Sequence, residues 1–301
     1  MSKEFTYAKA GVDRELRAKS KEALKHLSAT YKYSRYGKII RLPYGNIFPF
    51  GDRYLDLVIE GVGSKVLLAQ LADKCDTIGI DAVALAVNDV IRSGAKPLAI
   101  ADNIHAQVSN PRLVEEWIKG ITKGASEAEC LVPSGEIGDV AEVIKGLING
   151  KGFDMVVASI GEVAKKDIVY GNQIKSGDIV IGLRSSGIHS NGISLARKIL
   201  FKQWGGKYEP YDAPDGLNRE IVFEVLEPMR IYVKPIMNVL KEFNVKGLVH
   251  ITGDAYLKFN RLMEFSKGIG FEFDNFKPQP VFQLIQETAS ELKRPISDEE
   301  M

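Results

Sequence analysis

Residues 178 to 200 hold the pattern that most constrains the fold, because an apolar run, a small polar loop and an amphipathic run follow one another directly. The apolar run, Asp178 to Leu183, has the composition of a strand. In the last run, Ile193, Ala196 and Ile199 recur at helical spacing. The segment therefore predicts a strand that leads through a loop into a helix, the unit from which α/β domains are built.

The loop, Arg184-Ser-Ser-Gly-Ile-His-Ser-Asn-Gly192, contains one of only four histidines in the chain. A small polar loop that opens a helix presents unpaired N–H groups at the positive end of the helix dipole, which favours anions and phosphate above all. The alternative is an ordinary turn in which Ser190 or Asn191 caps the helix. We favour the anion site, because the loop exceeds what a cap needs and includes His189, a candidate phosphate ligand or acid–base group.

A second glycine-rich turn, Glu60-Gly-Val-Gly-Ser-Lys65, follows the predicted strand 54–60 and precedes a predicted helix, 66–72. Its glycines would let the backbone approach a ligand closely, its lysine could neutralise phosphate, and its acid could hold a metal. The spacing differs from that of the P-loop. By itself, this segment is equally consistent with an ordinary tight turn followed by a surface lysine that binds no ligand.

Carboxylates recur at the ends of apolar runs or inside them. Asn88 and Asp89 lie within an almost wholly apolar predicted helix, 82–93. A carboxylate there needs partners, because burying an ionised carboxylate without one is unfavourable in free energy or shifts its pKa. Asp81, Asp102 and Glu136 each end or follow an apolar run. Mg²⁺ takes hard oxygen ligands, usually one or two carboxylates together with nucleotide phosphates. Each acid alone could equally be a cap or a turn residue.

The remaining apolar patterns predict further elements. Helices are expected near 13–27, 113–128, 219–226, 231–243, 255–265 and 281–292, and strands near 97–102, 154–163, 247–251 and 269–273. Asp13 is the expected N-cap of the first helix. Residues 77–81 read as a short strand or a turn, and the glycine- and proline-rich segment 41–52 reads as a loop. The polar stretch 165–177 is the best domain boundary, which gives domains at 1–166 and 167–301.

Composition excludes several classes of protein. The chain has 301 residues with 40 lysines and arginines against 39 acids, so no basic excess points to nucleic acid. The two cysteines, Cys75 and Cys130, lack metal-site spacing and read as core thiols of a reducing compartment. The first residues form no apolar signal region, and no apolar stretch approaches the roughly 20 residues of a membrane span. We therefore expect a cytoplasmic protein that contacts neither membrane nor nucleic acid.

Several motifs together resemble the phosphoribosylformylglycinamidine cyclo-ligase family, also called aminoimidazole ribonucleotide synthetases, over nearly the whole chain. The matching segments are Tyr7-Ala-Lys-Ala-Gly-Val-Asp13, Glu60 to Lys65, Asp76-Thr-Ile-Gly-Ile-Asp81, Val87-Asn-Asp89, Ser185 to Gly192, Arg230-Ile-Tyr-Val-Lys234 and His250-Ile-Thr-Gly253. Their shared order is far more specific than any one of them. The serine–histidine–asparagine loop best separates this family from relatives of the same fold.

The resemblance implies a fold and a reaction. It implies two domains: an N-terminal domain with a mixed sheet, which meets the sheet of a second copy to form a barrel in a homodimer, and an α/β C-terminal domain. It also implies ATP and Mg²⁺ as cofactors and formylglycinamidine ribonucleotide as substrate. The formyl amide oxygen is activated as a phosphate ester, and the neighbouring nitrogen closes the imidazole ring and expels phosphate. Such a reaction needs cations beside the ATP phosphates, in-line placement of the formyl oxygen and the transferred phosphate, and a separate binding site for the ribose phosphate.

The resemblance also implies roles for individual residues. His189 and Lys65 are the implied catalytic residues. The implied nucleotide-binding residues are Glu60, Gly61, Gly63, Ser64, Asn88, Asp89 and Glu136. The implied substrate-binding residues are Ser185, Ser186, Gly187, Ser190, Asn191, Gly192, Thr252 and Gly253. The implied metal ligands are Glu60, Asp89 and Glu136, with Asp81 and Asp102 as weaker members.

The chain departs from the family pattern at several places. The family motif opens with aspartate where this chain has Glu60, and a glycine-rich turn is here Gly253-Asp-Ala255. The segment 134–141 keeps Glu136 but changes its neighbours. Two alternatives follow: another ATP-dependent kinase or synthetase of the same fold, and a non-catalytic paralogue that still binds nucleotide.

Overall fold

The computed structural model describes residues 5–275 and 277–296, and its N-terminal part is built on one mixed sheet. The strand order is β1-β2-β3-β6-β4-β5, in which only the β4–β5 pair is parallel. The strands are β1 Ile40–Leu42, β2 Gly45–Phe50, β3 Arg53–Gly61, β4 Lys96–Ala106, β5 Leu131–Asp139 and β6 Phe153–Ala164. Along β6 every second side chain is buried, the alternation of a sheet covered on one face.

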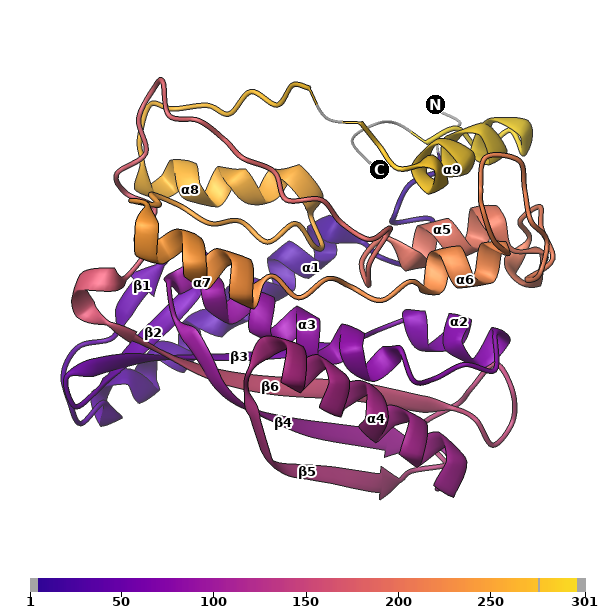
Figure 1. The fold of residues 1–301 in the computed structure, drawn as a ribbon, viewed down its shortest axis with the longest axis horizontal. Coiled ribbons are helices and arrows are strands. Elements are labelled where there is room, and N and C mark those ends of the chain that lie inside the picture. The colour runs from indigo at the N-terminus through magenta and orange to yellow at the C-terminus, as the bar shows by residue number, and fades with distance from the viewer. Residues whose placement is uncertain (1–4, 276, 297–301) are drawn as a thin grey trace.

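Three helices lie over one face of this sheet (Figure 1): α2 Lys65–Leu71, α3 Ile78–Val90 and α4 Pro111–Ala128. Every residue of α3 is buried, including Asp81, Asn88 and Asp89. The predicted apolar helix is thus confirmed, and the expected strand or turn at 77–81 forms its first turn instead. Because α3 is packed on all sides, its polar side chains must find partners inside the protein.

The segment 41–52, expected to be a loop, instead forms the β1–β2 hairpin and the turn into β3. Pro43 and Gly51 lie in the turns on either side of β2, whereas Gly45 and Pro49 belong to β2 itself, with Pro49 opposite Tyr54. The β5 strand was also missed. The predicted strands 54–60, 97–102 and 154–163 are confirmed as parts of β3, β4 and β6.

The C-terminal part consists of helices joined by extended segments. The helices are α5 Ile193–Leu200, α6 Ile221–Leu226, α7 Val233–Glu242, α8 Phe259–Phe265 and α9 Pro280–Glu291. The strands expected at 178–183, 247–251 and 269–273 do not form, since the described residues after β6 contain no strand. A strand requires a hydrogen-bonded neighbour, and here Ile179 and Ile181 remain 86% and 80% exposed. The strand predictions are wrong, although the mixed α/β class is confirmed.

A continuous apolar core joins the two parts. It includes Leu68 and Val83 from the helices on the sheet and Ile193, Ile221 and Val281 from the C-terminal helices. Helix α6 packs directly on α2, whereas α9 packs on α5 in an outer layer (Figure 1). The polar residues of α3 lie at this junction, which is where ligand sites between packed units commonly form.

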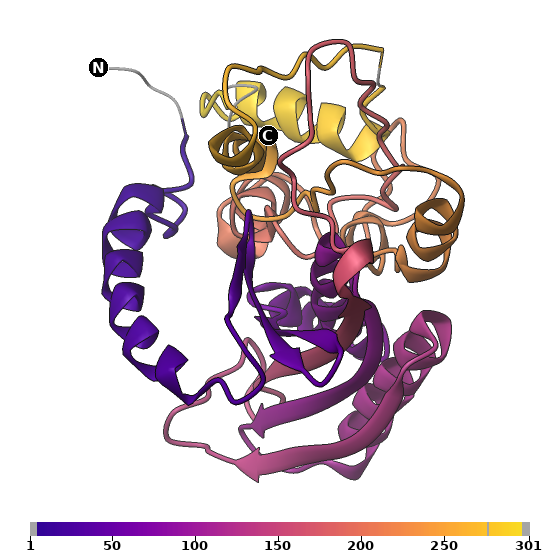
Figure 2. The ribbon, with the colours of Figure 1, turned by 90° about the vertical axis from the view of Figure 1, so that its left-hand side faces the viewer.

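The N-terminal arm, residues 13–33, stands apart from this core, although Ala10 just before it is part of the core. Its helix α1, Arg14–Lys21, begins at Asp13, whose carboxylate accepts a hydrogen bond from the Leu16 amide, as predicted. A 3₁₀ helix, Glu22–Tyr33, follows, and neither helix has a buried residue. Figure 2 shows the arm on the side of the sheet opposite α4.

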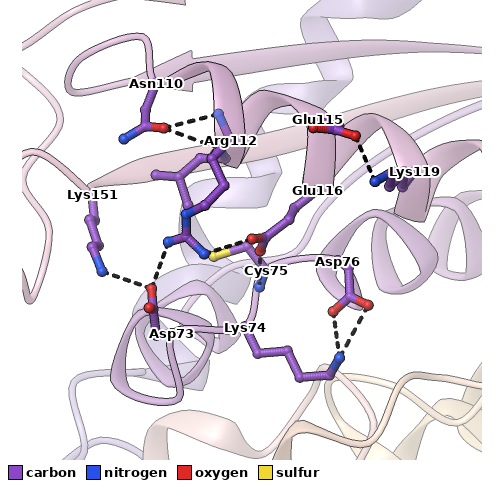
Figure 3. A network of polar contacts seen from close by, with 11 residues as sticks. Asp73, Lys74, Cys75, Asp76, Asn110, Arg112, Glu115, Glu116, Lys119 and Lys151 are labelled. Atoms are coloured by element: carbon purple, nitrogen blue, oxygen red, sulfur yellow. Dashed lines mark hydrogen bonds and ion pairs between the residues drawn. The ribbon is translucent and has the colours of Figure 1, made fainter.

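A surface network fixes the start of α4 to the turn between α2 and α3 (Figure 3). Asp73 accepts from Arg112 at 2.8 Å and from Lys151 at 2.7 Å, and the amide of Cys75 donates to Glu116 at 2.9 Å. Exposed ion pairs stabilise little individually, so the network aligns α4 more than it strengthens the fold.

Cys75 and Cys130 are free thiols. Within the described ranges, no helix is both long and apolar enough to cross a membrane.

Candidate functional site

The loop 184–192 is held between two segments of the C-terminal part. The hydroxyl of Ser186 donates to the Pro228 carbonyl at 2.6 Å, and Gln279 donates to the Ser185 carbonyl at 2.7 Å. Gly192 takes the N-cap position of α5 with a φ of 91°, and no side chain among the described residues caps the helix. The alternative in which Ser190 or Asn191 caps α5 is therefore wrong, and the first amides of α5 carry no side-chain partner.

His189 is buried and held in one orientation. It adopts a left-handed backbone with a φ of 63°, and its Nε2 accepts a hydrogen bond from the Ser186 amide at 3.0 Å. Burial lowers the pKa of His189 to about 3, and the charges of Lys65, His250 and Arg230 lower it further in the same direction. The imidazole is therefore neutral at physiological pH, with its proton on Nδ1, and that N–H is its available donor.

Because the His189 imidazole is buried, we expect the free energy of unfolding to fall in acid. An unfolded histidine titrates near pH 6.5, so between pH 6.5 and about 3 the unfolded chain binds the proton and His189 in the folded protein does not. Stability should therefore fall as the pH falls through this window, by about 1.4 kcal/mol per pH unit. His189→Asn, which tolerates a positive φ, removes the effect. Between pH 7 and pH 5, urea unfolding should show the wild type losing about 2 kcal/mol more than the variant. Equal losses would contradict the assignment.

A second group of polar residues surrounds Asp89 at the end of α3, and we call Glu60, Asp89, Arg92, His250 and Lys258 the Asp89 cluster. One carboxylate oxygen of Asp89 lies 2.7 Å from Nδ1 of His250, and the other lies 2.6 Å from the Arg92 guanidinium. Lys258 donates to the His250 carbonyl at 3.1 Å and also contacts the Thr252 hydroxyl. The cluster thus joins β3 and α3 to the 250–258 segment.

Burial sets the protonation of the Asp89 cluster. It raises the pKa of Glu60 to about 7, and the neighbouring charge of Asp89 raises it further. Burial would also raise the pKa of Asp89, but the hydrogen bond from His250 and the charge of Arg92 bring it below the ordinary value. Burial lowers the pKa of Lys258 to about 8. Two adjacent carboxylates whose ionisation is mutually unfavourable are a setting that a divalent cation would relieve.

A cavity of about 230 Å³ opens beside Glu60 and Asp89. The β1–β2 hairpin, from Leu42 to Ile47, forms one wall, and Gly247, Leu248 and Leu262 of the C-terminal part form another. Asp56 on β3 also lines it, and burial raises the pKa of Asp56 to about 6. The cavity therefore lies between the two parts of the chain, with three carboxylates at its edge.

The two loops of the site lie next to each other. Gly253 is close to Asn191, since a Cβ placed on Gly253 would be 3.8 Å from Nδ2 of the Asn191 side chain. The next residue, Asp254, has a positive φ of 72° and forms an ion pair with Arg17 of α1. The structure thus brings the predicted substrate residues of 185–192 together with Thr252 and Gly253.

Other predicted residues have different surroundings. Lys65 and Asp81 are paired with each other and fully buried. Asn88 donates to the Arg230 carbonyl and accepts from the Tyr232 amide, both at 2.8 Å, so it docks the 230–232 segment. In the glycine turn, Gly61 is the last residue of β3, and Gly63 has a left-handed backbone with a φ of 68°. The hydroxyl oxygen of Ser64 lies 2.9 Å from the hydroxyl oxygen of Ser194 on α5.

The five predicted metal ligands do not converge. Within the described ranges, no group of three or more His, Cys, Asp and Glu residues could hold a metal ion. Asp102 lies in the same row of the sheet as Glu60, two strands away, with its carboxylate against Gly135. Glu136 lies in the next row, and because side chains alternate it faces the opposite side of the sheet. Only Glu60 and Asp89 are neighbours.

Comparison with known proteins assigns the chain to a family. The sequence model for the N-terminal domain of AIR synthase related proteins matches residues 47–163, and the model for their C-terminal domain matches residues 175–301. The chain belongs to the AIR synthase related family. Within that family, it is 40% identical over 297 residues to the phosphoribosylformylglycinamidine cyclo-ligase of Pyrococcus furiosus, covering 96% of this chain and 83% of that protein.

A second relative and a solved structure support this assignment. The cyclo-ligase of Methanocaldococcus jannaschii is 38% identical over 302 residues, which cover 98% of this chain and 81% of that protein. Among solved structures, AaThiL complexed with AMPPCP and TMP superposes with a TM-score of 0.52 at 16% identity, over 83% of this chain and 69% of that chain. That likeness shows a shared fold. The resemblance inferred from the motifs is confirmed.

Sequence reasoning missed three members of the Asp89 cluster. His250 stands in one of the family motifs but was given no role, and neither Arg92 nor Lys258 was singled out. The signal for His250 was its place shortly before Thr252 and Gly253. Arg92 lies three residues after Asp89, the spacing at which helical side chains meet, so its ion pair with Asp89 was open to prediction.

Proposed function

We propose that the protein is an ATP-dependent phosphoribosylformylglycinamidine cyclo-ligase. It would convert formylglycinamidine ribonucleotide and ATP to 5-aminoimidazole ribonucleotide, ADP and phosphate. The observation that carries the proposal is the 40% identity to a named cyclo-ligase over 96% of the chain. The geometry supports it, because the two polar loops lie next to each other at Gly253 and Asn191, and Glu60 and Asp89 line one cavity.

The proposed roles follow from the positions of the residues. Glu60 and Asp89 fit one Mg²⁺ ion, because they are adjacent, they line the cavity, and the charge of Asp89 raises the pKa of Glu60. The ion would supply positive charge to the nucleotide phosphates. Lys258 and Arg92 add cationic groups at the same edge. AaThiL, which shares this fold, forms a complex with AMPPCP, whose triphosphate chain resembles that of ATP.

The loop 184–192 would hold the ribonucleotide. The amides at the start of α5, together with Ser185 and Asn191, offer donors to a phosphate group. His189 is neutral and would act as a hydrogen-bond donor through Nδ1 toward the formyl oxygen as charge develops there.

The test is turnover by the purified protein. With Mg²⁺, ATP and formylglycinamidine ribonucleotide, we expect ADP and aminoimidazole ribonucleotide to form in equal amounts. ATP hydrolysis that depends on a different acceptor would indicate another enzyme of the fold. Tight ATP binding by folded protein with no ADP release would indicate a non-catalytic paralogue.

We further propose a homodimer that forms through the face of the sheet opposite α3. Leu57 and Ile59 of β3 and Leu131 of β5 point to that face and are 58%, 68% and 62% exposed. An apolar surface on a regular sheet is the kind of surface that a second sheet covers. Light scattering after gel filtration should give a dimer for the wild type and a monomer for Leu57→Lys. The matched control, Ile179→Lys, changes an exposed isoleucine outside the sheet and should remain dimeric. A monomeric wild type would refute the dimer.

A further inference from the structure

Lys65 and Asp81 form the most deeply buried ion pair within residues 5–275 and 277–296. The Lys65 ammonium lies 2.9 Å from one Asp81 oxygen, and both side chains are 0% exposed. The second Asp81 oxygen has no hydrogen-bond partner among the described residues. Burying two charges carries a large desolvation penalty, and an unpaired carboxylate oxygen adds to it. The pair is therefore poorly suited to stabilise the fold, although its geometry is specific.

The remaining contacts of the pair all reach the C-terminal part of the chain. Lys65 on α2 donates to the Glu227 carbonyl at 2.7 Å. Asp81 on α3 accepts from the Ser190 hydroxyl at 3.0 Å and from the Met229 amide at 2.9 Å. The two charged residues thus belong to the sheet-bearing part, and their three partners belong to the other part.

Those three partners hold the site loop at both ends. Ser190 directly follows His189. The Pro228 carbonyl, between Glu227 and Met229, accepts from the hydroxyl of Ser186, whose amide donates to His189. The turn from Ser186 to Ser190 is therefore anchored to the ion pair at its end directly and at its start through Pro228. No contact of the pair reaches the cavity beside Glu60, whose lining includes neither residue.

We propose that Lys65 and Asp81 are positioning residues, whose buried pair fixes the 186–190 turn, and with it His189, against helices α2 and α3 of the sheet-bearing part. This replaces the direct roles in phosphate and metal binding that sequence patterns implied for them. Its catalytic consequence rests on the proposed function, whereas its structural consequence does not. Neither residue touches the reacting atoms; each acts through the turn that it holds.

The test compares the order of the turn in matched variants. Lys65→Met with Asp81→Leu replaces the ion pair by apolar side chains of similar volume, a change that folded proteins often tolerate. Hydrogen exchange of the Ser186 amide is the main measurement, because that amide bonds to His189 and touches neither altered residue. We expect exchange at Ser186 to rise at least tenfold. The KM for formylglycinamidine ribonucleotide should rise by a similar factor, while the KM for ATP stays within threefold of the wild type.

Gln70→Ala is the matched control. Gln70 is also a buried polar residue of α2, but its side chain accepts from the Leu147 and Ile148 amides, away from the site loop. The variant should lose stability without faster exchange at Ser186. Asp81→Asn keeps the shape but not the charge, and its exchange at Ser186 should exceed that of Gln70→Ala.

Wild-type exchange at Ser186 in the double variant would overturn the proposal. Should the double variant fail to fold, equal exchange in Asp81→Asn and Gln70→Ala would overturn it instead. If the wild type shows no cyclo-ligase turnover, the proposed function fails, and the exchange measurements still decide the positioning role.

Discussion

Asp89→Asn is expected to lower cyclo-ligase turnover by about a hundredfold or more while leaving the protein folded. Asp89 links His250 at 2.7 Å and Arg92 at 2.6 Å, and it borders Glu60 at the cavity. An asparagine fills the same space but carries no negative charge, so it would bind a cation weakly and would no longer balance Arg92. The kcat with saturating ATP and ribonucleotide measures the effect, and the apparent affinity for Mg²⁺ should fall with it.

Asp73→Asn is the matched control for the loss of one negative charge. Asp73 lies in the surface network of Figure 3, and its side chain is 55% exposed. It has a positive φ of 47°, which asparagine tolerates. We expect wild-type turnover from this variant. If Asp89→Asn retains turnover within threefold of the wild type, and circular dichroism shows both variants folded, Asp89 has no part in the reaction.

The sequence predicted those elements whose signal is local. The strand β3, the apolar helix α3 and the amphipathic helix α5 all follow from side-chain periodicity, and the Asp13 cap follows from its position before α1. The run 178–183 shows the limit of this reasoning. Its apolar residues have strand composition, but whether they form a strand depends on a partner, which composition does not reveal.

The candidate site was predictable where it lies in continuous motifs. The loop 184–192 and the 250–253 turn do lie close together, at Asn191 and Gly253, as the substrate-binding roles implied by the resemblance predict for both. The partners of the buried charges were not predictable from spacing alone. Lys65 and Asp81 are 16 residues apart on different helices, so nothing local showed that they neutralise each other. A lysine after a glycine turn suggested a phosphate ligand, whereas tertiary packing buries it completely.

The position of the α3 residues in the site depends on how closely α3 packs against α4. The two helices meet at Gly79 and Gly120, and a Cβ placed on Gly120 would lie 3.0 Å from the Gly79 Cα and still closer to the Asp76 carbonyl oxygen. These neighbours are backbone atoms at the start of α3, which cannot rotate away as a side chain would. Any side chain at Gly120 must therefore push α3 away from α4 and shift the polar residues that α3 carries.

Gly120→Ala is accordingly expected to destabilise the protein by about 3 kcal/mol, since overpacking against backbone outweighs the roughly 1 kcal/mol by which alanine favours a helix. Gly270→Ala is the control, because Gly270 lies outside the sheet, a Cβ there meets no atom within 4 Å and its φ is not positive. Urea unfolding should show the loss in Gly120→Ala, together with a melting temperature lower by about 6 °C or more, and a change below about 1 kcal/mol in the control. Equal stability of the two variants would show that α3 and α4 can separate without cost, and α3 would then not fix the position of Asp89.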